Sequence, residues 1–160
     1  MTPSQAGKPR ETLMIVEDEV LIAMVLRDEL EDAGYHVLDL TDRHAEALEV
    51  ANTCNPDLAL VNIRLAGRDD GIELAVQLKA LGIPVLLISG QTDRARSART
   101  VAIASLPKPY AAADMVLSVT YLLARLKGDT SLAAPPGLEV FDGDGHDLAP
   151  AGLGSPSTVS

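Results

Sequence analysis

The sequence predicts an α/β protein with a doubly wound sheet of five parallel strands, and three observations lead to this prediction. Five short aliphatic runs, bounded by charged residues, Gly or Pro, alternate with segments in which apolar residues recur every three or four positions. Such alternation is typical of parallel β-α units joined by right-handed crossovers. Trp is absent and Phe141 is the only phenylalanine, so the core must rest on aliphatic side chains, which suits a sheet buried on both faces.

The individual elements follow from this pattern. The predicted strands are residues 12–16, 36–40, 58–62, 84–89 and 101–106. The predicted helices lie within residues 23–33, 44–53, 69–82, 93–100 and 116–126. Gly34 is expected to end the first helix, and Thr41 or Asp42 to cap the second. Asp69 and Asp70 are expected to open the third helix.

The charge and the domain boundaries narrow the class of protein. A formal charge of -10 disfavours nucleic acid and anionic membranes as partners. No apolar run reaches the roughly 18 residues that span a bilayer, and residues 1–10 do not resemble a signal peptide, so we expect a cytoplasmic protein. The single cysteine, Cys54, is expected to be a small buried residue.

Only the middle of the chain has the composition of a folded domain. Residues 11–127 are expected to form this domain, after a disordered N-terminus of residues 1–10. Residues 128–160 contain Pro135-Pro136, repeated Gly and Ser, acidic residues and no Lys or Arg. This composition predicts a disordered acidic tail.

Polar side chains follow four of the predicted strands. Glu17 and Asp18 come directly after the first strand, Asn62 ends the third, Ser89 ends the fourth, and Lys108 follows the fifth. In a doubly wound sheet, functional groups gather at the carboxyl ends of the strands. Taken alone, the acids could equally cap the helix that follows them. Together with the other three groups they predict a functional site at one edge of the sheet.

With these residues in place, the sequence resembles the receiver domain of bacterial two-component response regulators over about residues 11–127. The resemblance rests on the run from Pro56 through Asn62 to Gly71, on Ser89-Gly90 and on Lys108-Pro109. It implies a flavodoxin-like (βα)5 fold with strand order 2-1-3-4-5. It also implies a signalling phosphoprotein of a phosphorelay, not an enzyme, that docks a histidine kinase or phosphotransfer protein and then a downstream protein.

The resemblance also implies roles for the polar residues. Mg²⁺ would be held by Glu17, Asp18, the side chain at position 62 and the backbone carbonyl of Arg64. Phosphoryl transfer requires such a divalent cation near the phosphoryl oxygens.

Two further residues would contact the phosphoryl group. Ser89 and Lys108 would sense it as a switch. The peptide bond between Lys108 and Pro109 would be cis, as is common in this family.

Asn62 is the main departure from the family, because the phosphoacceptor of a receiver is an aspartate. An amide is a poor nucleophile, so we expect that Asn62 blocks aspartyl phosphorylation, and that the lost charge weakens Mg²⁺ binding. Two explanations remain open. Asn62 is either the natural residue of a receiver that works without phosphorylation, or an engineered substitution that holds the unphosphorylated state.

The expected output face is formed by the fourth helix, the fifth strand and the fifth helix. Ser105 stands where many receivers have a switch aromatic, and Tyr110 fits another position that is often aromatic. Both are possible output-face residues. Residues 128–160 are too few and too polar for an output domain, so we expect signalling by protein contact, and this face is also a candidate homodimer surface.

An alternative is a small flavodoxin-like cofactor-binding protein or enzyme. Its phosphate site would need a Gly- or Ser-rich loop after the first strand, and aromatic residues to hold a flavin. This sequence has acids at that loop and few aromatics. A third alternative, a truncated DNA-binding regulator, finds no basic residues in the tail to support it.

Overall fold

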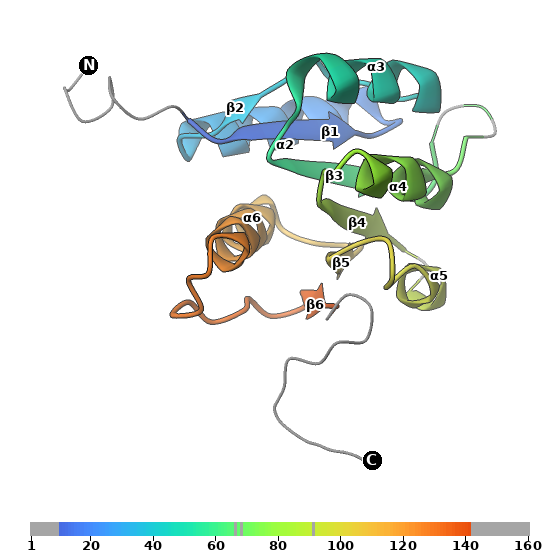
Figure 1. Cartoon of the computed structure of the whole chain (residues 1–160). Coiled ribbons are helices and arrows are strands. Elements are labelled where there is room, and N and C mark those ends of the chain that lie inside the picture. The colour runs from blue at the N-terminus through green and yellow to red at the C-terminus, as the bar shows by residue number, and fades with distance from the viewer. Residues whose placement is uncertain (1–9, 66, 68, 91, 142–160) are drawn as a thin grey trace.

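A computed structural model describes residues 10–141 except 66, 68 and 91. Its sheet has the strand order β2-β1-β3-β4-β5-β6 (Figure 1). The strands are β1 (Thr12–Val16), β2 (His36–Val37), β3 (Leu58–Asn62), β4 (Val85–Ser89), β5 (Ala104–Pro107) and β6 (Glu139–Val140). The first five are parallel, and β6 pairs antiparallel with β5. The predicted order 2-1-3-4-5 is confirmed, with β6 as an added edge strand.

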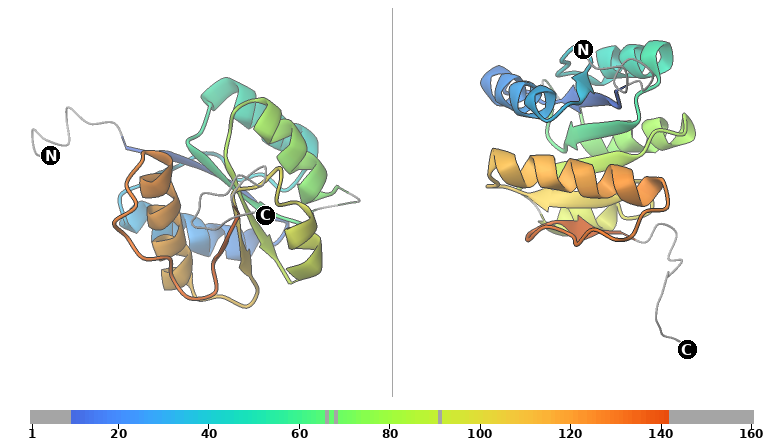
Figure 2. Two further views of the ribbon diagram at one scale, coloured as in Figure 1. Left: turned by 60° about the horizontal axis from the view of Figure 1, so that its bottom comes forward. Right: turned by 90° about the vertical axis from the view of Figure 1, so that its left-hand side faces the viewer.

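Helices cover both faces of the sheet (Figure 2). The helices are α2 (Val20–Asp32), α3 (His44–Cys54), α4 (Gly71–Ala80), α5 (Thr92–Ser97) and α6 (Ala112–Leu126). Buried residues of α3, α4 and α5 share one core cluster, and buried residues of α2 and α6 share the other. The doubly wound architecture predicted from the sequence is confirmed.

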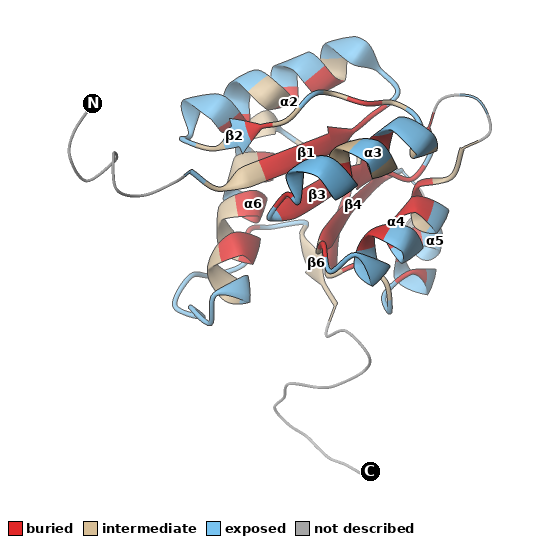
Figure 3. Cartoon of the chain, turned by 45° about the horizontal axis from the view of Figure 1, so that its top comes forward, coloured by how far each residue is buried: buried red, intermediate tan, exposed pale blue. Residues whose placement is uncertain are grey.

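The central strands are buried from end to end (Figure 3). Alternate residues of β1 face opposite sides: Met14 packs with α3 and α4, whereas Ile15 packs with α2 and α6. Continuous aliphatic runs are required for strands that are covered on both faces, which explains why these strands were recognisable in the sequence.

The predicted strands 36–40 and 101–106 are longer than the strands observed. β2 is confined to His36–Val37, although the Leu38 N–H still donates to the Leu13 carbonyl at 2.9 Å. β5 begins only at Ala104, because the N–H groups of Val101 and Ala102 donate to the Ala98 carbonyl in a turn after α5. Apolar composition alone did not separate these turn residues from the strand.

The helix caps are a mixture of confirmed and corrected predictions. Asp70 caps α4, since its side chain accepts a hydrogen bond from the Ile72 N–H at 2.8 Å. The prediction that Thr41 or Asp42 caps the second helix is wrong, because the N-cap of α3 is Arg43. The Asp69 carboxylate, 25 residues away in sequence, accepts the His44 N–H at 2.7 Å and thus serves the α3 terminus instead.

The predicted disordered tail is wrong for residues 128–141. After α6 the chain crosses the end of the sheet and adds β6 to the free edge of β5 (Figure 1). A turn makes this possible: the Leu138 N–H donates to the Pro135 carbonyl at 3.3 Å, and Gly137 has φ +87°. The predictions for residues 1–9 and 142–160 lie outside the described residues.

Two smaller observations concern the surface. Cys54 is exposed at the end of α3, so the prediction that it is buried is wrong. Within the part of the chain that the structure describes, no helix is long and apolar enough to cross a membrane.

Candidate functional site

The polar residues singled out in the sequence meet at the carboxyl edge of the sheet, as expected from parallel strands. They surround a pocket of about 410 Å³. The pocket is lined by Asp18, Glu19, Asn62, Ile63, Arg64, Ser89, Gly90 and Lys108. Glu17 lies beside it, buried at 1% exposure, and is hydrogen-bonded to Asn62.

The side-chain amide of Asn62 lies at the centre of the acidic part of this pocket. Its Nδ2 donates to Glu17 Oε2 at 3.2 Å, to Asp18 Oδ1 at 3.0 Å and to the Arg64 carbonyl oxygen at 2.9 Å. Only the nitrogen end of the amide fits among three acceptors, because the oxygen end would face them without a proton to share. The two protons of one NH₂ group are therefore shared among the Glu17 carboxylate, the Asp18 carboxylate and the Arg64 carbonyl.

The Glu17 carboxyl group is perturbed by this environment. Its pKa is raised from the ordinary 4.5 to about 7, first because burial disfavours the charged form and then because of the neighbouring Asp18 carboxyl group. The Glu19 N–H, which donates to Glu17 Oε2 at 3.1 Å, and the charge of Lys108 lower the pKa in part. Among the described residues, Glu17 Oε1 is buried without a hydrogen-bond partner.

Gly71 fixes the position of the strand end that carries Asn62. Its N–H donates to the Ile63 carbonyl at 2.6 Å. A Cβ at this position would overlap the Asn62 carbonyl oxygen and lie 2.8 Å from Ile63 Cα. Only glycine allows the start of α4 to approach β3 so closely. Gly71 is part of the family motif, but its positioning role is not visible from the sequence alone.

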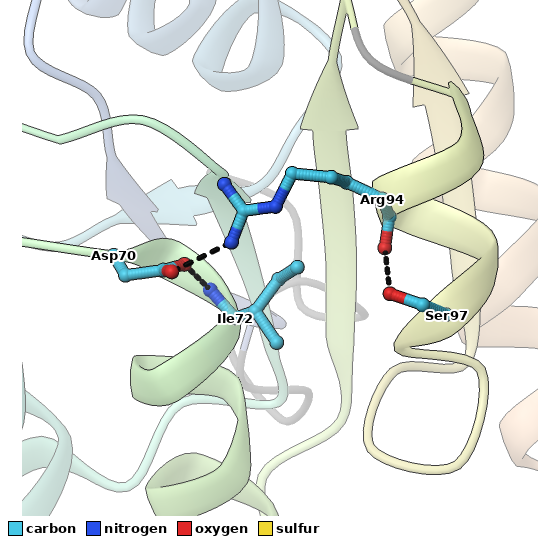
Figure 4. A network of polar contacts seen from close by, with 4 residues as sticks. All are labelled: Asp70, Ile72, Arg94 and Ser97. Carbon is cyan, nitrogen blue, oxygen red and sulfur yellow. Dashed lines mark hydrogen bonds and ion pairs between the residues drawn. The ribbon is translucent and has the colours of Figure 1, made fainter.

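Asp70 links the same loop to α5 (Figure 4). One oxygen of its carboxylate accepts the Ile72 N–H, and the other pairs with Arg94 at 2.6 Å. Ser97 Oγ in turn donates to the Arg94 carbonyl at 2.6 Å. The beginning of α4 and the short helix α5 are thereby joined next to the pocket, a connection that sequence spacing did not reveal.

Ser89 and Lys108 also line the pocket, but they come from the ends of β4 and β5, whereas the acids follow β1. Ser89 is buried at the end of β4, and its carbonyl accepts the Lys108 N–H at 2.9 Å. The peptide bond between Lys108 and Pro109 is cis, as the resemblance implied. The Lys108 charge lowers the pKa of Glu17, so the two side chains interact across the pocket.

Neither of the two possible output-face residues is exposed. Ser105 lies in β5, on the expected face, but it is 3% exposed and is paired with Leu87 in β4 and with Glu139 in β6. Tyr110 is half-buried against the α2 and α6 cluster, and burial raises its pKa to about 12, with a smaller contribution from Glu17. Tyr110 therefore lies on the α2 side of the sheet edge.

A second cavity of about 450 Å³ adjoins Tyr110. It runs between α2 and the segment that begins at Lys108. Next to it, Leu21 and Val25 are exposed at 77% and 53%. This apolar groove was not predicted from the sequence: Leu21 lies before the predicted helix, and Val25 is not among the residues whose spacing predicted it.

The residues of the acidic pocket can be tested against Mg²⁺, the ion that the fold implies. Two carboxylates and one backbone carbonyl converge, which is the oxygen donor set that a hard cation prefers, and Glu17 Oε1 is available as well. The point on which they converge, however, holds the Asn62 NH₂ group. The donor set fits the ion only if this amide turns away.

The fold and this pocket are those of a small flavodoxin-like α/β domain with an acidic site at the carboxyl edge of the sheet. Residues 13–120 match the family model of the response regulator receiver domain. The chain therefore belongs to the response regulator receiver domain family of two-component systems. This membership confirms the resemblance and the predicted fold, and it sets aside the cofactor-binding alternative.

Known proteins agree with this membership. The transcriptional regulatory protein PdtaR of Mycobacterium tuberculosis strain H37Rv is 32% identical over 135 residues, covering 82% of this chain and 65% of PdtaR. The chain thus spans just under two thirds of the length of this relative.

Solved structures give the same picture. The signal receiver domain of a modulated diguanylate cyclase from Desulfovibrio desulfuricans G20 is 36% identical with a TM-score of 0.64, covering 74% of this chain and 98% of that one. The receiver domain of NtrX from Brucella abortus is 30% identical with a TM-score of 0.64, covering 71% and 98%. Receiver domains therefore occur in proteins with different further domains.

Proposed function

We propose that this receiver transmits a signal by protein contact without accepting phosphate on residue 62. The observation that carries the proposal is the Asn62 amide, whose nitrogen donates to Glu17, Asp18 and the Arg64 carbonyl. In this arrangement a neutral donor contacts the acids that a cation would otherwise neutralise.

The chemistry of the amide argues against transfer to this side chain. The amide oxygen shares its electron density with nitrogen and carries no full negative charge, so it lacks the nucleophile from which an acyl phosphate forms. The nitrogen has its protons engaged with three acceptors. Neither atom of the amide is therefore suited to attack a phosphorus atom.

Mg²⁺ is proposed to bind more weakly here than in a receiver with aspartate. The ligands would be Glu17, Asp18, the Arg64 carbonyl and Asn62 Oδ1 after rotation of the amide. When bound, the ion supplies positive charge for phosphoryl oxygens. Binding must first break the hydrogen bonds of the Asn62 NH₂ group, and one anionic ligand is lacking.

Ser89 and Lys108 both line the pocket, which supports the proposal that a phosphoryl group there would contact them. With asparagine at position 62, we propose that Lys108 instead balances the charge of the two acids. The pocket would then favour a single resting conformation. The population of that conformation would be changed by a bound partner and not by phosphate.

The partner is proposed to be a histidine kinase or phosphotransfer protein, followed by a downstream protein, with the chain acting in the cytoplasm. The groove between α2 and the Lys108–Tyr110 segment supports this placement, because its apolar rim at Leu21 and Val25 lies close to the pocket. A partner that covers this groove would reach both the apolar surface and the edge of the sheet.

The proposal is tested with a small-molecule phosphodonor. Acetyl phosphate and Mg²⁺ are added to the parent chain, to Asn62→Asp and to Asn62→Ala. The intact mass of each protein is then measured. We expect one phosphoryl group on Asn62→Asp and none on the parent or on Asn62→Ala. A phosphoryl adduct on the parent that is absent from Asn62→Ala would overturn the proposal.

A further inference from the structure

The free edge of β5 is occupied by the chain's own C-terminal strand. Glu139 lies opposite Ser105 and Val140 opposite Ala104, in antiparallel register. The Phe141 N–H continues the ladder by donating to the Ile103 carbonyl at 2.8 Å. β6 is the last strand of the sheet and lies at its lower end in the right-hand view of Figure 2. An edge strand that would otherwise expose its backbone groups is thereby covered.

The side chains of this segment attach to both layers of helices. Phe141 packs against the core cluster of α3, α4 and α5, whereas Leu138 packs against the cluster of α2 and α6. The Glu139 carboxylate accepts from Arg96 Nε on α5, with both oxygens at 3.1 Å. Residues 138–141 thus combine a backbone ladder, two apolar contacts and one ion pair.

The attachment is short and its ion pair is exposed. β6 has two residues, and the Arg96 and Glu139 side chains are 60% and 38% exposed. Exposed ion pairs contribute little to stability, and a two-residue edge strand opens at small cost. The segment therefore has the properties of a peptide ligand that can be exchanged, in contrast to the central strands.

We propose that the β5 edge between α5 and α6, together with Arg96, is a binding site for an extended peptide with an acidic residue among apolar ones. Residues 138–141 are its built-in ligand. A partner protein reaches this face by adding its own extended acidic segment to β5 after β6 has been displaced. The face of α5, β5 and α6, which is the expected surface for output and dimerisation, is accordingly closed while β6 is bound.

The first test exchanges the charges of the ion pair in the full chain. Hydrogen exchange of the Phe141 amide is measured by NMR in Arg96→Glu, in Glu139→Arg and in the double variant. Each single variant should exchange about fivefold faster than the parent, and the double variant should return toward the parent rate. Arg99→Glu is the matched control, because it makes the same charge change without an ion pair to β6 among the described residues. Equal exchange rates of the Phe141 amide in all variants would contradict the proposal that residues 138–141 are a built-in ligand.

The second test adds the ligand from outside. Phe141→Pro removes the N–H that donates to Ile103, and so weakens the built-in strand in the full chain. A synthetic peptide with the sequence of residues 136–141 is titrated into this variant and into the parent, with β5 resonances as the readout and a scrambled peptide as control. We expect at least tenfold tighter binding to Phe141→Pro than to the parent. Equal affinity for both proteins, or no binding to either, would overturn the proposal.

Discussion

The amide nitrogen of Asn62 donates a hydrogen bond to the buried carboxylate of Glu17 over 3.2 Å. The two residues lie 45 positions apart in sequence and are brought together because β1 and β3 are parallel neighbours. Glu17 Oε2 therefore accepts hydrogen bonds from the side chain of residue 62 and from the Glu19 N–H. Most of the expected behaviour of the pocket follows from this pair.

Asn62→Asp should make the stability of the chain depend on Mg²⁺. A carboxylate next to those of Glu17 and Asp18 replaces three donated hydrogen bonds with repulsion, which should lower the free energy of unfolding by about 1–3 kcal/mol without metal. Mg²⁺ should restore it by binding only the folded state. Thermal unfolding with and without the ion measures this, and a parent chain stabilised by Mg²⁺ as strongly as the variant would contradict the account.

Glu17→Gln should change how stability varies with pH. The folded pKa of about 7 lies above the ordinary 4.5, so the folded state holds a proton that the unfolded state releases as pH rises. This contribution is fully present below pH 4.5 and is lost as pH rises through 7. Glu17→Gln should reduce the loss of stability between pH 5 and pH 8 by about 1–3 kcal/mol in denaturant titrations. Asp93→Asn, on an exposed carboxyl of α5, serves as control and should retain the parent profile.

Gly71→Ala should displace the strand end that carries Asn62. The added methyl group overlaps the backbone of Asn62 and Ile63, so we expect a loss of more than about 2 kcal/mol. Gly90→Ala is the matched control, because a Cβ there meets nothing within 4 Å. Urea unfolding of both variants checks this, and equal stabilities would show that Gly71 does not position the site.

Removing the Asp70 side chain should lower the free energy of unfolding more than removing the Arg94 side chain. Asp70→Ala loses the cap of α4 and the ion pair, which together stabilise by about 1–2 kcal/mol, whereas Arg94→Ala loses only the exposed pair, about 0.2–1 kcal/mol. A double-mutant cycle in urea separates the two contributions. If Arg94→Ala proved the more damaging change, the cap would not be the main role of Asp70.

Much of the fold and of the site was predictable for definite physical reasons. Strands such as Leu58–Asn62 are buried on both faces and must be continuously aliphatic, which sequence shows directly. Parallel strands then bring Glu17, Asn62 and Lys108 to one edge. Family resemblance supplied the expected roles of these residues.

The remainder depends on contacts that local sequence does not encode. Pro135-Pro136-Gly137 has the composition of a disordered segment, yet it forms the turn that returns β6 to the sheet. The capping of α3 by Asp69 depends on a residue 25 positions away. The sequence also does not show that the Asn62 NH₂ group points toward Glu17, Asp18 and the Arg64 carbonyl. It thereby occupies the position on which these possible metal ligands converge.

The side-chain NH₂ signals of Asn62 test the central claim most directly. In the parent chain we expect these NMR signals to be protected from hydrogen exchange and unchanged by millimolar Mg²⁺, because both protons are held by Glu17, Asp18 and the Arg64 carbonyl. Exchange as fast as that of an exposed amide, or a large shift at micromolar Mg²⁺, would show that the amide does not hold the pocket.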